Sequence, residues 1–127
     1  MKARDPHVIP LSQRALDILK SARVAYPDSE LVFPGAKQGR PLSDMTLTKV
    51  LRSAALGDRA TAHGFRSSFK DWCAEIAKAS DDVSEAALAH KIPNKVRAAY
   101  LRTKFLDERR LLMQQWADYV SRVLQAA

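Results

Sequence analysis

The sequence predicts an α+β domain that is mainly α-helical and has a small β-sheet of short strands. Apolar residues recur at helical spacing along most of the chain, which indicates amphipathic helices. Short apolar runs bounded by proline or turn-forming residues occur in the first third of the chain and indicate strands. The chain has 127 residues, of which 46% are apolar, enough for one domain with a core or for part of a larger domain.

The expected strands comprise residues 7–11 and residues 31–34. Pro6 and Pro10 lack the backbone N–H that a central strand donates to its neighbour, so the first strand should lie at a sheet edge or end there. Residues 35–41 are rich in turn formers and basic groups, which predicts a loop.

Helices are expected wherever apolar residues follow a helical period. Ser12 belongs to a residue type favoured as an N-cap and precedes one such segment, and Ser43 starts the next one. The expected helices cover residues 13–25, 43–56, 61–79, 83–89, 95–101 and 106–124. In the third of these, the following residues are expected to pack inward: Phe65, Phe69, Trp72, Cys73 and Ile76.

The last expected helix carries apolar residues on more than one narrow stripe. These residues are Leu112, Met113, Trp116, Tyr119, Val120 and Val123. Two hypotheses follow, because the wide apolar surface could cover the core of its own chain or contact another subunit.

Basic residues outnumber acidic residues by 21 to 14, which gives a net charge of +7. Such a surplus in a small domain favours a polyanionic partner such as nucleic acid, although a solubilising surface charge is the alternative. No apolar run is long enough to span a membrane, and the N-terminus does not resemble a secretory signal. Cys73 is the only cysteine, which excludes an internal disulfide and fits a reducing cytoplasm.

Several polar residues could hold or attack a phosphate. His63 and Arg66 are three residues apart, so they would share a face of a first helical turn, where backbone N–H groups also favour an anion. His90 follows a short apolar helix, and Tyr100 follows two small alanines that would leave its hydroxyl accessible. Each residue also has a structural interpretation: a solvated helix face, a histidine bonded to a helix-terminal carbonyl, and a core tyrosine.

No metal or cofactor is expected. The residues His7, His63, Cys73 and His90 match no zinc spacing. The sequence contains no glycine-rich phosphate loop and no paired-carboxylate motif. Cys73 lies beside Trp72 within an expected helix, which favours a core residue over a nucleophile.

In combination these motifs are far more specific than each is alone. His63-x-x-Arg66, Leu88-Ala89-His90 and Ala98-Ala99-Tyr100 resemble, in order and spacing, the signature of the tyrosine recombinases. The stretches over residues 4–12 and 107–119 resemble integrases of prophages and genomic islands, so the resemblance covers nearly the whole chain. It implies that residues 1–127 are a partial, N-terminally truncated catalytic domain of a tyrosine recombinase.

The resemblance also implies a role for each matching residue. Tyr100 would attack the scissile phosphate and form a 3′-phosphotyrosine link. Arg66 would clamp the non-bridging oxygens, and His63 would assist proton transfer or orient the phosphate. His90 would hydrogen-bond the phosphate as charge builds, and Lys2 would be the general acid for the leaving 5′-oxygen. From the sequence alone, Lys2 is otherwise a terminal lysine with no fixed role.

The chain departs from the family pattern at one catalytic position. Family members carry another arginine in a Thr-Gly-x-Arg segment upstream of the lysine, and no residue here matches it, since Arg4 follows Lys2. The domains that grip DNA in the family are also unmatched. The implied partners are a double-stranded attachment site and, in the full-length protein, further subunits of a tetramer, with no membrane. The chain by itself is expected to be inactive.

Two other functions fit part of the pattern. The first is a non-catalytic basic helical DNA-binding module, and the second is an interaction domain that uses the helix containing Trp116. The order of His63, Arg66, His90 and Tyr100 favours a recombinase, because plain DNA binding does not require it. These four residues are therefore expected to lie around one basic concavity.

Overall fold

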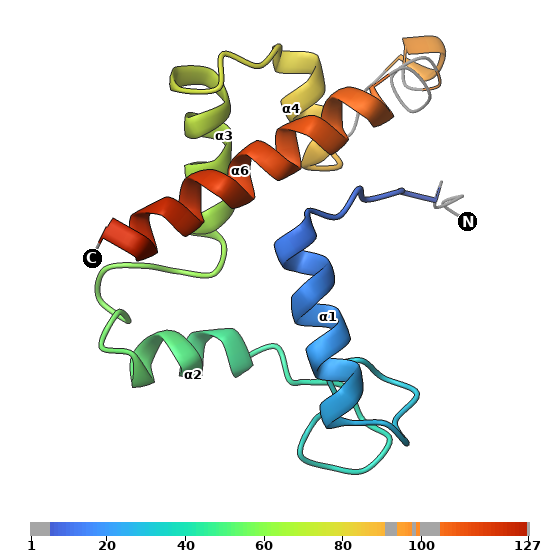
Figure 1. Ribbon diagram of the computed structural model, residues 1–127, viewed down its shortest axis with the longest axis vertical. Helices are drawn as coiled ribbons and strands as arrows, with labels where there is room; N and C mark the ends of the chain where they lie inside the picture. The colour runs from blue at the N-terminus through green and yellow to red at the C-terminus, as the bar shows by residue number, and fades with distance from the viewer. Residues whose placement is uncertain (1–5, 91–93, 98, 100–104, 127) are drawn as a thin grey trace. The chain divides into compact units, whose positions relative to one another are not determined.

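The computed structural model describes residues 6–90, 94–97, 99 and 105–126, and for residues 123–126 only the backbone. This part of the chain is mainly helical, and Figure 1 shows its helices. They are α1 (Gln13–Ala25), α2 (Thr46–Ser53), α3 (Gly64–Glu75), α4 (Asp81–Ala87) and α6 (Leu106–Ala126). None of these helices is long and apolar enough to cross a membrane.

The chain forms two compact units. The middle unit is Arg14–Ser68 and contains most of α1, all of α2 and the start of α3. The outer unit combines Met1–Gln13 with Phe69–Ala127 and contains the rest of α3 together with α4 and α6. No residue of the middle unit is buried, so the core of the described residues lies in the outer unit.

The core of the outer unit joins three helices. Its buried members are Phe69, Trp72, Cys73, Val83 and Leu112, from α3, α4 and α6. On α3 they follow the i, i+3, i+4 spacing that places side chains on one helix face. Trp116 of α6 adds two aromatic contacts, with ring centroids 5.5 Å from Phe69 and 5.0 Å from Trp72. Each large side chain fully buried in this way contributes about 1.5–3 kcal/mol.

Capping interactions set the ends of α3 and α4. The Thr61 hydroxyl accepts a hydrogen bond from the Gly64 N–H at 2.9 Å, where α3 begins. After α3, Lys78 adopts a left-handed φ of 52° and the Ala79 N–H donates to the Cys73 carbonyl, which closes the helix end. The Ser80 hydroxyl then accepts the Val83 N–H at 3.3 Å and caps α4.

The first described segment is held to α6 rather than to a sheet. Arg109 is buried, and its Nη1 donates a hydrogen bond to the Val8 carbonyl at 2.9 Å. Gln114 accepts the backbone N–H of Gln13 at 2.9 Å. Burial lowers the pKa of Arg109, but an arginine remains charged, so the Val8 carbonyl offsets part of the cost of burying it.

The prediction of a small β-sheet is wrong for the described residues. Residues 7–11 and 31–34 form no strand, and the pairing found in this region is an isolated antiparallel bridge between Pro34 and Pro41. A strand persists only when its N–H and C=O groups meet a paired neighbour, and proline removes the donor. Here the Val8 carbonyl is taken by Arg109, and Gly35 donates across the loop to the Arg40 carbonyl at 2.7 Å.

The expected helices are present, with shifted ends. The start of α1 and of α6 is as predicted, and α6 runs two residues further. The helix expected from Ser43 begins at Thr46, since residues 43–46 form a turn in which the Thr46 N–H donates to the Ser43 carbonyl. Residues 95–97 are helical, and the rest of the helix expected over 95–101 lies partly outside the described residues.

Two residues expected in the core are exposed. Phe65 and Ile76 are each 55% exposed. Ile76 lies beyond the last residue of α3, where the chain turns, so it leaves the helix face that carries Trp72. Phe65 lies one turn before Phe69, in the unit whose residues are not buried. Helical periodicity alone overestimated the length of the packed face.

One face of α6 covers the core of its own chain. Leu112 is 3% exposed, and Trp116 packs against the core. Leu111 is 62% exposed, and Tyr119 and Val120 are exposed as well. The helix therefore has a core function, which was one of the two hypotheses, and it also has apolar residues left at the surface.

The neighbouring residues Leu111 and Leu112 provide a matched test of this packing. We expect Leu112→Ala to lower the free energy of unfolding by about 2–5 kcal/mol, because it leaves a cavity in the core. Leu111→Ala should change it by less than about 0.5 kcal/mol. Denaturant unfolding followed by circular dichroism measures both, and equal effects of the two substitutions would contradict this description of α6.

Candidate functional site

His63 and Arg66 lie at the start of α3, as the sequence predicts. His63 immediately precedes the helix, and Arg66 belongs to its first turn. The Arg66 N–H donates to the His63 carbonyl at 3.0 Å, so one hydrogen-bonded turn fixes the spacing of the two residues. Both residues are exposed. A cationic side chain in a first helical turn next to a histidine suits an anionic ligand such as a phosphate.

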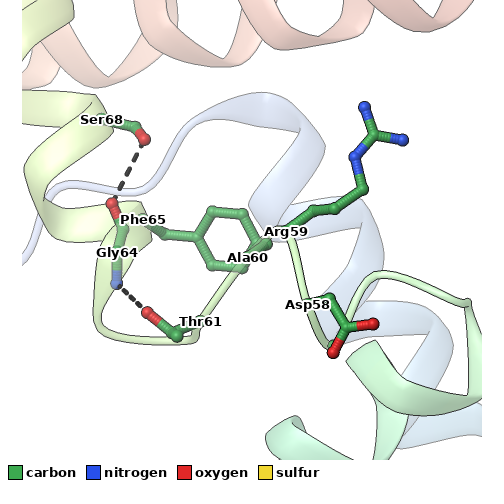
Figure 2. A pocket seen from close by; sticks show the side chains of 8 residues that line it. Asp58, Arg59, Ala60, Thr61, Gly64, Phe65 and Ser68 are labelled. Carbon is green, nitrogen blue, oxygen red and sulfur yellow. Dashed lines mark hydrogen bonds between the residues drawn. The ribbon is translucent and has the colours of Figure 1, made fainter.

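A shallow cavity of about 330 Å³ lies beside this turn (Figure 2). Its lining comes from residues 57–61 and from Gly64, Phe65 and Ser68 of α3. Figure 2 shows the hydrogen bonds from the Gly64 N–H to Thr61 and from the Ser68 hydroxyl to the Gly64 carbonyl, at 2.9 and 3.2 Å. Neither His63 nor Arg66 lines the cavity, so we assign no chemistry to it.

His90 lies just after α4, in the outer unit. Ala89 adopts a left-handed φ of 55°, which turns the chain back so that the His90 N–H donates to the Glu85 carbonyl at 3.1 Å. The His90 Nδ1 is also hydrogen-bonded to the Glu85 carboxylate. The His90 side chain is 43% exposed, so a ligand has access to it.

A cluster of charged residues connects α3 with α4 and includes Glu85, the partner of His90. The Lys70 ammonium lies 2.7 Å from Asp81 Oδ1, 2.7 Å from Ser84 Oγ and 2.5 Å from Glu85 Oε1. Burial by itself lowers the pKa of Lys70, but the hydrogen bonds and charges of Asp81 and Glu85 outweigh it and raise that pKa. Hydrogen bonds from Lys70 and then from His90 lower the pKa of Glu85.

Sequence reasoning did not find this cluster. Asp81 and Glu85 are four residues apart, which is a visible sign of a shared helix face. Lys70 lies in another helix, and only the packing of α3 against α4 brings it to them.

The segment before Tyr100 is anchored in two ways. The Asn94 side chain accepts the N–H groups of Val96 and Arg97, both at 3.0 Å, as an N-cap does. Arg97 also forms an ion pair with Asp82 of α4. Tyr100 and Lys2 lie outside the described residues.

The predicted site residues thus fall in different parts of the chain. His63 and Arg66 belong to the middle unit and His90 to the outer unit. Because Tyr100 lies outside the described residues, the expected gathering of the four around one concavity stays a prediction.

Cys73 does not add to the site. The Cys73 thiol is 1% exposed, and burial raises its pKa to about 11, so it is a core residue as the sequence indicated. Among the described residues, no group of three or more His, Cys, Asp or Glu side chains could hold a metal ion.

Comparison with known proteins matches the chain to integrases of phages and prophages. The chain is 39% identical over 124 residues to an integrase of Enterobacteria phage P4, covering 94% of this chain and 28% of that protein. It is 37% identical over 124 residues to the prophage integrase IntZ of Escherichia coli K12, covering 98% of this chain and 31% of that protein. The prophage integrase IntA of the same strain is 40% identical over 121 residues, with coverages of 94% and 29%.

The chain is a homologue of phage and prophage integrases. It spans between 28% and 31% of the length of these relatives. No protein-family model and no solved structure matches the chain.

Because the pKa of Glu85 is lowered, we expect its contribution to the stability of the fold to depend on pH in the acid range. A carboxylate whose pKa is lower in the folded state stabilises the fold above its ordinary pKa, here 4.5, and loses that effect as the pH falls through the lower folded value. The stability difference between the wild type and Glu85→Gln should therefore shrink below about pH 4.5. Urea unfolding at a series of pH values measures it, with Glu75→Gln at the exposed end of α3 as the charge-matched control. A constant difference across the acid range would contradict the assignment.

Proposed function

We propose that the chain belongs to the DNA-cleaving domain of a tyrosine-type site-specific integrase, with a tyrosine recombinase-like catalytic fold of which it forms a part. The observation that carries the proposal is the order His63, Arg66, His90 and Tyr100 in a chain whose relatives are integrases over 94% of its length. The net charge of +7 supports a nucleic-acid substrate.

The reaction is a transesterification that needs no cofactor. The Tyr100 hydroxyl oxygen attacks the phosphorus of the scissile phosphodiester while the bond from phosphorus to the 5′-oxygen breaks. The tyrosine proton passes to a base at the site, and the leaving 5′-oxygen receives a proton from Lys2. The phosphate stays on Tyr100 as a 3′-phosphotyrosine, and attack by a 5′-hydroxyl reverses the step. The energy of the phosphodiester is conserved in the covalent link.

Positioned cations and donors make this chemistry feasible. A phenol with a pKa of about 10 is largely protonated at neutral pH, so a tyrosine nucleophile needs a proton acceptor and an activated phosphate. Arg66 supplies a bidentate fork for the non-bridging oxygens. His63 orients the phosphate or moves a proton, and His90 donates a hydrogen bond as negative charge develops.

The proposed partners follow from the same assignment. The substrate is a double-stranded attachment site, and the reaction takes place in the cytoplasm of a bacterial host. In the longer protein, subunits associate on DNA as a tetramer. The exposed residues Leu111, Tyr119 and Val120 of α6 are the apolar groups we propose for a subunit contact, since apolar and aromatic side chains are favoured there.

The 127-residue chain alone should bind DNA without cleaving it efficiently. It has no match to the second catalytic arginine, and loss of one charge-stabilising group costs on the order of 10²–10³ in rate. We expect binding to a duplex that weakens steeply with salt, measured by fluorescence anisotropy. A suicide attachment-site duplex on a denaturing gel should show no covalent adduct in the time a complete integrase needs. Salt-independent or absent binding would favour an interaction domain instead.

A chimera tests the nucleophile directly. The chain would replace the matching segment of the phage P4 integrase, which supplies the rest of that protein. We expect a covalent protein–DNA adduct that Tyr100→Phe abolishes and Tyr119→Phe retains, because Tyr100 is the proposed nucleophile and the Tyr119 ring contacts Trp72 and Trp116. An adduct that survives Tyr100→Phe would overturn the assignment. Tight binding with no adduct in a folded chimera would favour the non-catalytic DNA-binding module.

A further inference from the structure

We propose that Glu85 is a positioning residue for His90, fixing its ring through Nδ1 so that Nε2 alone faces the substrate. The inference rests on the proposed function, because it concerns how one phosphate-contacting residue is oriented. It adds residues that the recombinase signature in this chain does not contain: Glu85 and its anchor Lys70.

The Glu85 carboxylate uses its two oxygens for two different partners. Oε1 lies 2.5 Å from the Lys70 ammonium, and Oε2 is hydrogen-bonded to the His90 Nδ1. The Glu85 side chain is 29% exposed, so it is more enclosed than His90 at 43%. A carboxylate that is tied at one oxygen can present the other in a fixed direction.

Lys70 is itself held at several points. Besides Glu85, its ammonium bonds to Asp81 Oδ1 and to Ser84 Oγ, each at 2.7 Å. The Ser84 hydroxyl, which is buried, donates in turn to the Asp81 carbonyl at 2.9 Å. Because Lys70 follows the core residue Phe69 on α3, the position of this anchor depends on the packed core.

The backbone brings His90 to Glu85 independently of the side chains. The His90 N–H donates to the Glu85 carbonyl at 3.1 Å, and Ala89 takes a left-handed φ of 55° to allow it. A left-handed conformation is unfavourable for alanine, so the turn persists because other contacts compensate. The two hydrogen bonds between residues 85 and 90 fix both the main chain and the ring.

The chemical consequence concerns the second ring nitrogen. A carboxylate at Nδ1 keeps a proton on that nitrogen, so Nε2 is the ring nitrogen left for the substrate. When the ring carries a second proton, its Nε2–H can donate to a phosphate oxygen as negative charge builds. Carboxylates orient histidines in this way at metal and acyl-transfer sites.

A purely structural bridge is the competing explanation. In that case Glu85 would serve only to join α4 to Lys70, and its contact with His90 would be incidental. Lys70 already has Asp81 and Ser84 as partners, so joining the helices does not require Glu85. Removing Glu85 takes away the acceptor of the His90 Nδ1–H. The response of the His90 ring to that loss separates the two explanations.

Nitrogen-15 NMR of the 127-residue chain reports which ring nitrogen of His90 carries the proton. At alkaline pH, where the imidazole is neutral, we expect the wild type to hold the proton on Nδ1. Glu85→Gln should retain this tautomer through its amide oxygen, and Glu85→Ala should shift it to Nε2. Glu75→Gln serves as the control. A wild-type ring protonated on Nε2 would overturn the proposal, and that spectrum does not depend on any variant folding.

Adduct formation in the chimera tests the functional consequence. Glu85→Ala should slow the reaction on the order of 10–100-fold without weakening DNA binding, and Glu85→Gln should restore part of the rate. An unchanged rate in Glu85→Ala, with the adduct still dependent on Tyr100, would reject the role of Glu85 alone. An adduct independent of Tyr100 would instead reject the proposed function.

Discussion

The packing of α3 against α4 and α6 is the interaction on which the outer unit depends. Phe69 and Trp72 meet Val83 and Leu112 in one apolar cluster, and Trp116 closes it with ring contacts at 5.0 and 5.5 Å. Removing this surface from water is the main stabilising term, because the polar contacts at the surface contribute little by themselves. The cluster also fixes where the polar side chains of α3 and α4 meet.

The apolar core also fixes the positions of the polar side chains in the outer unit. Lys70 is the next residue after Phe69, so the packing of α3 carries its ammonium to Asp81, Ser84 and Glu85. His90 then joins the cluster through Glu85. A histidine that is only half-buried thereby acquires a defined orientation without contributing to the core. Such support by enclosed partners is how a folded chain keeps an accessible residue ready for a ligand.

Arg109 plays the corresponding role for the first described segment. Its buried guanidinium holds the Val8 carbonyl, and the Gln114 side chain of the same helix accepts the N–H of Gln13. The segment around Val8 to Gln13 therefore depends on α6, 101 residues later in the sequence.

Local sequence pattern predicted the helical character, the start of α1 and α6, and the position of His63 and Arg66 where α3 begins. It also predicted the core residues Phe69, Trp72, Cys73 and Leu112. These features depend on local periodicity and on neighbours in the chain, which a sequence displays directly. Tertiary structure alone decided the rest. It left residues 7–11 without a strand partner, exposed Phe65 and Ile76 beyond the packed face, and brought Lys70 to Glu85 and His90. Pairing, burial and long-range ion pairs depend on which distant segments meet, and that is set by the packed core rather than by local pattern.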